Sequence, residues 1–264
     1  MNINDAKIAA ELLHKTLREG SVIEALNPEL RPSDRAEGYL IQQQLEAYSQ
    51  HPVYGWKIAA TSEAGQQHIG IDGPIAGRIF AETVLSFGEL VPFGANRMRV
   101  VEAEFAFHLG RDIPPRESAY GVDEVIESVG QLHLALEIPD SRFEDFVTAG
   151  GPQLIADNAC AYRFILGPVV PASWRELDLA AHQVVGRVNQ TQVFEGCGAN
   201  VLGDPRVALT WLVNELSGMG IGLRAGQIVT TGTTTVPMPV NPGDYIEADF
   251  GALGHLSCQF GIDD

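Results

Sequence analysis

Two glutamates spaced two residues apart, Glu102 and Glu104, are the residues of this chain whose types and spacing point most clearly to chemistry. They lie in the run Val-Glu-Ala-Glu-Phe-Ala-Phe (101–107), whose other members are apolar or small. In a β-strand, successive side chains point to opposite faces, so both carboxylates would share one face. Adjacent carboxylates repel, and burying them is costly unless a cation or a proton compensates. A hard divalent cation with oxygen ligands would suit this pair.

A third acid, Glu137, lies in the second alternating run, Leu-His-Leu-Ala-Leu-Glu-Ile (132–138). As a strand, this run would place its leucines on one face and Glu137 on the other. Three carboxylates without Cys or His at ligand spacing predict Mg²⁺ or Mn²⁺ rather than zinc. The alternative is that Glu-x-Glu lies on the solvated face of an edge strand. Such faces usually carry Lys, Thr and Arg, whereas this one continues with Ala106 and His108.

The composition excludes several classes of partner. The 264 residues include 17 basic and 34 acidic side chains, and the resulting net charge of −17 would repel nucleic acids and anionic membranes. The three cysteines are scattered and form no CxxC motif, which favours a reducing compartment over a disulfide framework. The first residues contain no long apolar run after a basic segment, so we expect neither a signal peptide nor a membrane-spanning segment. We therefore expect a cytoplasmic protein with a small-molecule substrate.

The pattern of apolar residues changes near His51, from helical spacing before it to short β-rich runs after it. Apolar residues at helical spacing predict one helix over 5–18, closed by Gly20, and a second from Ser33 to the His-Pro pair at 51–52. Residues 1–52 are accordingly predicted to form an N-terminal helical segment.

The remaining chain, residues 53–264, is predicted to be a β-rich, metal-binding catalytic domain. Short β-rich runs are broken by Gly and Pro turns, with two further helices at 123–129 and 206–217. The predicted strands are 53–60, 99–109, 132–138, 161–166, 183–188, 228–230 and 245–250. Strands without regular βαβ alternation favour an α+β fold with a mixed, barrel-like sheet over a doubly wound one.

Six motifs occur in an order typical of one enzyme group. They are Ala-Glu-Gly-Tyr-Leu-Ile-Gln (36–42), Gly-Trp-Lys-Ile-Ala-Ala-Thr-Ser-Glu-Ala (55–64) followed by Gly-Ile-Asp-Gly-Pro (70–74), Val-Glu-Ala-Glu (101–104), Ala-Leu-Glu-Ile-Pro-Asp-Ser-Arg (135–142), Ala-Asp-Asn-Ala (156–159) and Pro-Gly-Asp (242–244). In these motifs the chain resembles the 2-keto-4-pentenoate hydratase and 4-oxalocrotonate decarboxylase group of the fumarylacetoacetate hydrolase superfamily. The resemblance runs from about residue 33 to the end.

The resemblance implies a β-barrel or β-roll body of the fumarylacetoacetate hydrolase C-terminal type, assembled as a homo-oligomer, with a sister enzyme of the same pathway as a further possible partner. It implies a Mg²⁺ or Mn²⁺ ion held by Glu102, Glu104 and Glu137, with Lys57 as the catalytic lysine. It also implies substrate contacts from a wider set, namely Arg142, Asn158, Thr231, Gly232 and Thr233. The implied activity is that of a lyase of aromatic-compound catabolism, which acts on a small 2-oxo or 2-hydroxydienoic acid through a metal-stabilised enolate.

Departures from the group's pattern leave the reaction open. Where the hydratases carry an acid before the glycine of Pro-x-x-Gly, this chain has Ile75, and where they carry a serine after Asp-Asn-Ala, it has Cys160. The Thr-Gly-Thr turn at 231–233 is closer to the hydrolase branch. A 2-keto-4-pentenoate hydratase-like reaction is the one we expect, and decarboxylation of a 4-oxalocrotonate-type acid and carbon–carbon hydrolysis of a 2,4-diketo acid are the alternatives. A non-catalytic subunit that binds a metal and an organic acid is an alternative of another class.

Overall fold

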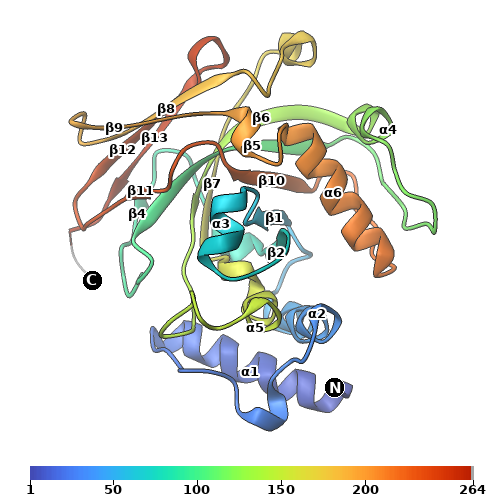
Figure 1. The fold of residues 1–264 in the computed structure, drawn as a ribbon. Helices are drawn as coiled ribbons and strands as arrows, with labels where there is room; N and C mark the ends of the chain where they lie inside the picture. The colour runs from blue at the N-terminus through green and yellow to red at the C-terminus, as the bar shows by residue number, and fades with distance from the viewer. Residues whose placement is uncertain (263–264) are drawn as a thin grey trace.

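A large curled sheet forms the centre of the protein, as the computed structural model of residues 1–262 shows (Figure 1). Its strand order is β2-β1-β10-β5-β6-β7-β3, and β11 pairs with β5 outside this path. The strands are β1 (Gly55–Ala59), β2 (Ile75–Ile79), β3 (Val84–Leu85), β5 (Val100–Leu109), β6 (Val129–Ile138), β7 (Arg163–Val169), β10 (Ile228–Thr233) and β11 (Met238–Pro239). Both β5 and β6 are ten residues long and lie in the middle of this order.

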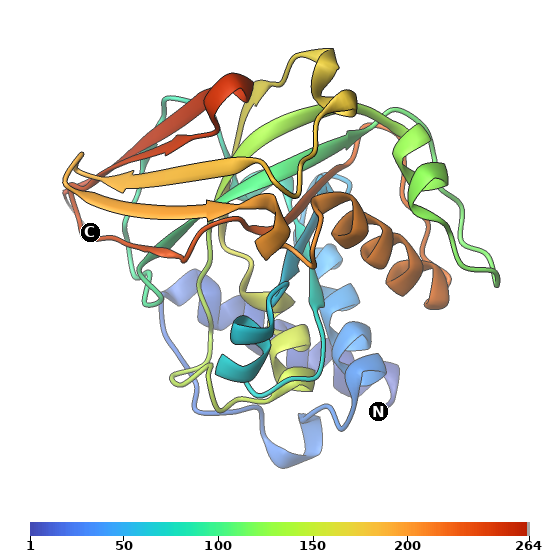
Figure 2. The ribbon, with the colours of Figure 1, turned by 45° about the horizontal axis from the view of Figure 1, so that its top comes forward.

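A second sheet packs against one face of β5. Its order is β4-β13-β12-β8-β9. The strands are β4 (Leu90–Val91), β8 (Gln183–Val188), β9 (Gln192–Cys197), β12 (Tyr245–Asp249) and β13 (His255–Phe260). Figure 2 shows the last four, in orange and red, together at the rim of the molecule. The ring of Phe105 on β5 meets that of Phe250 edge to face, with centroids 5.1 Å apart. The apolar side of the alternating run therefore forms the core between the sheets, which leaves the glutamate side for the opposite face.

Helices cover the other side of the large sheet and its edge. They are α1 (Ile3–Glu19), α2 (Arg35–Gln44), α3 (Glu63–His68), α4 (Val122–Glu127), α5 (Gly151–Ala156) and α6 (Pro205–Gly218), and Figure 1 shows α1, α2 and α5 grouped together. Asn2 caps α1, and Gly20 ends it in the left-handed conformation. Within residues 1–262, no helix is both long and apolar enough to cross a membrane.

The α+β class with a curled mixed sheet is confirmed, while several boundaries differ from the prediction. The second helix begins after Asp34, whose side chain accepts the Glu37 N–H, and gives way to a 3₁₀ turn at Leu45–Tyr48. Strand β10 runs to Thr233 because a bulge lets it continue past Thr230. The short elements β2, β9, β13, α3 and α5 were not predicted. The division of the chain near His51 stays a prediction.

Candidate metal centre

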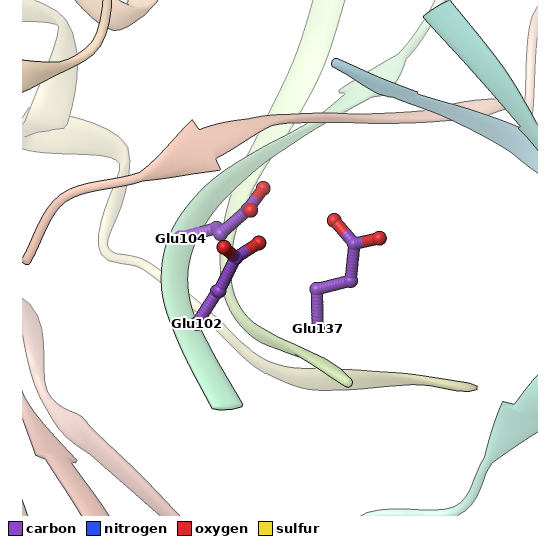
Figure 3. A group of neighbouring side chains, drawn as sticks. All are labelled: Glu102, Glu104 and Glu137. Carbon is purple, nitrogen blue, oxygen red and sulfur yellow. The ribbon is translucent and has the colours of Figure 1, made fainter. Parts of the chain in front are cut away.

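The three glutamates come together on one face of the large sheet (Figure 3). Glu102 and Glu104 extend from β5, and Glu137 on β6 is the direct cross-strand partner of Glu102. One oxygen from each carboxylate lies within 4.8 Å of the others. Glu104 and Glu137 are buried, and Glu102 is partly exposed toward a cavity. The alternating pattern thus places three acids where one small ion could contact all of them.

Hydrogen bonds hold Glu104 in place but leave ligand positions free. The Thr230 hydroxyl and the Gly232 N–H, 2.8 Å away, both donate to Oε2 of Glu104, and the bulge in β10 brings these two donors together. Within residues 1–262, Oε1 of Glu104 and Oε2 of Glu137 are buried without a hydrogen-bond partner, and Oε1 of Glu137 has the Lys57 ammonium beside it at 2.9 Å. Buried polar atoms normally have partners, so these oxygens indicate a missing ligand.

Lys57 lies beside the cluster on β1. Its ammonium is 2.9 Å from Oε1 of Glu137 and donates a hydrogen bond of 2.9 Å to the Ala159 carbonyl. Burial opposes the charged form, but the carboxylates of Glu137 and Glu102 outweigh it and raise the pKa of Lys57. An ammonium has three N–H donors, so one is left for a ligand in the cavity. The structure thus excludes the interpretation of Lys57 as a surface residue, since it is 2% exposed.

The electrostatics of the cluster favour a divalent cation. Burial, followed by the charge of Glu137, raises the pKa of Glu102 to about 7, and burial also raises the pKa of Glu104 and Glu137. When every group is ionised, three carboxylates and one ammonium leave a formal charge of −2. A divalent cation would cancel that charge, and its preference for oxygen ligands matches the donor set. The residues therefore fit Mg²⁺ or Mn²⁺.

An unusual turn supplies the carbonyl that Lys57 contacts. Asn158, Ala159 and Cys160 all have positive φ, at 55°, 51° and 61°. Left-handed backbone at non-glycine residues is strained and persists only where the surroundings enforce it. The Asn158 side-chain amide enforces it here, because it accepts the Arg78 N–H at 2.7 Å and donates to the Arg78 carbonyl at 2.8 Å.

The turn packs tightly against β2. A Cβ added to Gly77 on that strand would come within 2.3 Å of the Asn158 carbonyl oxygen, so only glycine permits this contact. The neighbouring buried Asp157 carboxylate accepts hydrogen bonds from the Ser141 hydroxyl and from Arg142. These contacts anchor the N-terminal end of the segment that reaches Lys57.

A cavity of about 700 Å³ opens in front of the cluster. Lys57 and Glu102 line it, together with Gly232, Thr233 and Thr235 from the end of β10 and the segment after it. The Thr235 hydroxyl is buried and has no hydrogen-bond partner within residues 1–262. Two of the residues implied as substrate contacts, Gly232 and Thr233, thus reach the cavity wall.

The other three implied contacts lie outside this cavity lining. The Arg142 guanidinium is ion-paired with Asp157 and donates to backbone carbonyls, and both ends of the Asn158 amide bind the backbone of Arg78. The Thr231 hydroxyl donates to the Phe105 carbonyl at 3.0 Å. Their polar groups bind other groups of the protein, so these residues support the backbone around the site and do not contact the cavity.

Four contributors to the site were not singled out from the sequence. They are the hydroxyls of Thr230 and Thr235, the Ala159 carbonyl and Thr61, whose side chain packs where a Cβ on Gly232 would lie. The run of threonines at 230–235 was the one available signal. The positive φ values of the turn left no trace in the sequence, because its residues are not glycines.

Comparison with known proteins shows the family to which this chain belongs. The model of the fumarylacetoacetate (FAA) hydrolase C-terminal family matches residues 79–260, a span that contains all three glutamates. The chain belongs to the fumarylacetoacetate hydrolase family. This membership confirms the superfamily resemblance seen in the six motifs.

Relatives in the family carry different reaction names. The chain is 31% identical to a 2-keto-4-pentenoate hydratase of Paraburkholderia xenovorans over 255 residues, which are 96% of this chain and 93% of that protein. It is 29% identical to a 4-oxalocrotonate decarboxylase of Pseudomonas putida over 262 residues, 98% of this chain and 94% of the relative. The two identities are too close to select one reaction.

Solved structures of the family share the fold. The 4-oxalocrotonate decarboxylase of Pseudomonas putida G7, complexed with magnesium and adipate, superposes with a TM-score of 0.89 at 27% identity, and the match covers 98% of both chains. A fumarylpyruvate hydrolase of Pseudomonas aeruginosa, complexed with Mn²⁺ and pyruvate, has a TM-score of 0.61 at 16% identity and covers 81% of this chain and 93% of its own. The second likeness supports the fold alone.

Proposed function

We propose that this protein is a divalent-metal-dependent lyase that acts on a small 2-oxo or 2-hydroxydienoic acid, with Mg²⁺ or Mn²⁺ held by Glu102, Glu104 and Glu137. The observation that carries the proposal is the buried carboxylate cluster. Its ligand oxygens lie within 4.8 Å of one another, Oε1 of Glu104 and Oε2 of Glu137 are buried without hydrogen-bond partners, and the cluster opens onto a cavity of about 700 Å³. The magnesium in the solved 4-oxalocrotonate decarboxylase supports this choice of ion.

The bound ion would supply a Lewis acid that stabilises negative charge on a 2-oxo acid as it becomes an enolate. Lys57 is the catalytic residue of this chain. Its ammonium is held by Glu137 and the Ala159 carbonyl, and its remaining N–H can bind the substrate or deliver a proton. The unpartnered hydroxyl of Thr235 offers a second polar contact in the same cavity. The apolar walls would exclude water from the reacting atoms.

Hydration of a 2-keto-4-pentenoate-type substrate is the reaction that we propose first, because it is the name carried by the relatives at 30 to 32% identity over most of the chain. Decarboxylation is the second candidate, favoured by the TM-score of 0.89 to a decarboxylase. Ile75 and Cys160, the two departures from the hydratase pattern, both line the cavity. They therefore lie where they can alter which bond is made or broken.

A substrate panel tests this proposal. The purified protein with Mn²⁺ is incubated with 2-hydroxypenta-2,4-dienoate, 4-oxalocrotonate and a 2,4-diketo acid, and the ultraviolet absorbance is followed. Turnover of the first substrate that is abolished by EDTA and restored by Mn²⁺ supports the hydratase, and turnover of the second or third assigns the alternatives. A folded, metal-loaded protein that turns over none of them would instead fit the non-catalytic partner subunit.

The cellular compartment and the oligomeric state of the protein form part of the same proposal. The three free cysteines, Cys160, Cys197 and Cys258, fit the expected reducing, cytoplasmic compartment. A homo-oligomer is expected, with a sister enzyme of the same pathway as a further partner. Light scattering of the purified protein, alone and mixed with the candidate partner, measures both.

A further inference from the structure

The cavity has one polar end and extensive apolar walls. Its two charged groups are Lys57 and Glu102 on the sheet, and the hydroxyls of Thr233 and Thr235 come from the end of β10 and the segment after it, whereas apolar side chains from several other segments line much of the remainder. Six of these are Ile69, Ile75, Met98, Phe146, Leu154 and Val236. A 2-oxo acid whose head group binds at the glutamate cluster must therefore place its tail among apolar side chains.

The charges on the lining show which tails can be accommodated. Among the described residues that line the cavity, Lys57 and Glu102 carry full charges, and Lys57 is already ion-paired with Glu137. The lining contains no arginine within residues 1–262. His68 lies on the exposed surface of α3, where its ring meets Phe146 edge to face with centroids 6.0 Å apart.

Two polar side chains in the wall are also occupied. The Ser62 hydroxyl caps α3 by accepting the Gly65 N–H, and the Asn200 amide donates to the Thr234 carbonyl at 2.8 Å. A second carboxylate on the substrate would thus enter the cavity without a cationic partner. Burying an unpaired carboxylate opposes binding, whereas burying each CH₂ group favours it.

We infer that this site selects 2-oxo and 2-hydroxydienoic acids with an uncharged alkyl or alkenyl tail, and discriminates against dicarboxylic acids of the same length. The tail lies between α3 and the side chains of Ile75, Phe146 and Leu154. The inference rests on the proposed function, since it takes the carboxylate and oxo group of the ligand to bind at the metal centre. It concerns the opposite end of the ligand, which can be tested separately.

A matched pair of ligands provides the test. 2-Oxohexanoate and 2-oxoadipate share the 2-oxo acid head and chain length, but one ends in a methyl group and the other in a carboxylate. Calorimetry on the Mn²⁺-loaded protein at pH 8 should show 2-oxohexanoate binding at least tenfold more tightly. In the series 2-oxobutyrate, 2-oxopentanoate and 2-oxohexanoate, affinity should rise with each added CH₂ group, by up to roughly fourfold at full burial.

Two results would overturn the inference in different ways. Equal or tighter binding of 2-oxoadipate would refute the selection against charged tails and leave the metal-dependent function intact. Absence of binding by every 2-oxo acid, in a protein that binds Mn²⁺, would refute the proposed function and the inference together.

A positively charged side chain introduced on α3 tests where the tail of the ligand lies. Ala64 is an exposed residue of α3 that lines the cavity, so Arg is compatible with the helix there. Ala64→Arg should reduce the preference for 2-oxohexanoate over 2-oxoadipate at least fivefold, while Ala64→Gln, of similar size without the charge, should leave it unchanged. A folded Ala64→Arg protein with the unaltered preference would show that the tail does not lie beside α3.

Discussion

Nζ of Lys57 lies 2.9 Å from Oε1 of Glu137, and each side chain is only 3% exposed. The two residues are on strands that do not pair, because β10 and β5 separate β1 from β6 in the sheet. The curl of the sheet brings them together across those two strands (Figure 1). The ion pair therefore depends on the shape of the whole sheet, and it ties the proposed catalytic lysine to a proposed metal ligand.

Lys57→Met removes the ammonium but keeps most of the side-chain stem. We expect kcat to fall by about 100-fold or more if Lys57 handles a proton in the reaction. In the metal-free protein, the unpaired Glu137 should cost about 3–5 kcal/mol of the free energy of unfolding, and bound Mn²⁺ should recover part of that loss. Steady-state kinetics and thermal melts measure the two effects.

The matched control is Lys7→Met, because Lys7 is exposed on α1 far along the chain from the site. It should change neither quantity measurably. An unchanged kcat in Lys57→Met, in a protein that folds and binds metal, would exclude Lys57 from the reaction.

Glu104→Gln replaces a buried carboxylate oxygen by an amide nitrogen that cannot ligate a cation. We expect the affinity for Mn²⁺ to fall about tenfold or more, in line with the loss seen when a metal site's supporting groups are disturbed. Calorimetric titration of the metal-free variant gives the value. Glu195→Gln on the exposed face of β9 is the control for charge alone. Equal affinities in the two variants would mean that Glu104 is not a ligand.

Metal binding should stabilise the fold, because an ion relieves the repulsion among three closely set carboxylates, two of them buried. At a free ion concentration 100 times the dissociation constant, the free energy of unfolding should rise by about 2.7 kcal/mol. Thermal melts with millimolar Mn²⁺ or Mg²⁺, and again after excess EDTA, measure the change. A melting temperature that changes neither with the ions nor with EDTA would contradict the proposed metal centre.

The sequence predicts those parts of the site that follow the period of a strand. Alternation placed Glu102 and Glu104 on one face of their strand and Glu137 opposite the leucines of another, and the structure pairs these two strands and brings the three acids together. The sequence could not show that Arg142 and Asn158 lie outside the cavity. Arg142 is held by Asp157, and Asn158 is held by the backbone of β2, which is far from it in the chain.

The short strands were harder to predict for a related reason. Residues 75–79 form the short strand β2, which lies between a Gly-Pro turn and a 3₁₀ turn. Every residue of this strand is buried, so the sequence shows no alternation of apolar and polar residues that would predict a strand. The bulge in β10 and the positive φ values at 158–160 arise from tertiary contacts that force the local backbone. Local sequence preference therefore says little about either feature.

Thiol reactivity should separate the three cysteines. Burial raises the pKa of Cys160 and of Cys258 to about 12, with the charge of Asp157 adding to the effect at Cys160. Because the thiolate is the reactive form, roughly one part in ten thousand of each is reactive at pH 8. Their rates should rise about tenfold per pH unit below the pKa, whereas the partly exposed Cys197 should react first.

A disulfide reagent that releases a coloured thiol can follow these rates, with circular dichroism to verify that the protein stays folded. Cys197→Ser should remove the fast phase and leave the two slow ones. A thiol that still reacts fast in that variant at pH 8 would disprove the assignment of the fast phase to Cys197 and of the slow phases to Cys160 and Cys258. Because Cys160 lines the cavity, 2-oxohexanoate with Mn²⁺ should slow its modification further.

Gly77→Ala tests the close contact behind the left-handed turn. The new Cβ would lie 2.3 Å from the Asn158 carbonyl oxygen, so the turn must shift and carry the Ala159 carbonyl away from Lys57. We expect a loss of about 1–3 kcal/mol in stability, as for other overpacked core sites, with a marked loss of kcat. Gly73→Ala is the control, since its Cβ would meet nothing within 4 Å. Wild-type stability and kcat in Gly77→Ala would show that the turn adapts freely.

The pairing of Glu102 with Glu137 constrains where this chain can change in length during evolution. Deleting one residue inside β5 would exchange the faces of the strand, sending the carboxylates into the core and Phe105 into the cavity. The connection between β5 and β6 is largely exposed over 110–121, so insertions there leave the register untouched. Homologues should accordingly vary in length between the two strands and keep a fixed number of residues within each, whatever acid they have come to use as substrate.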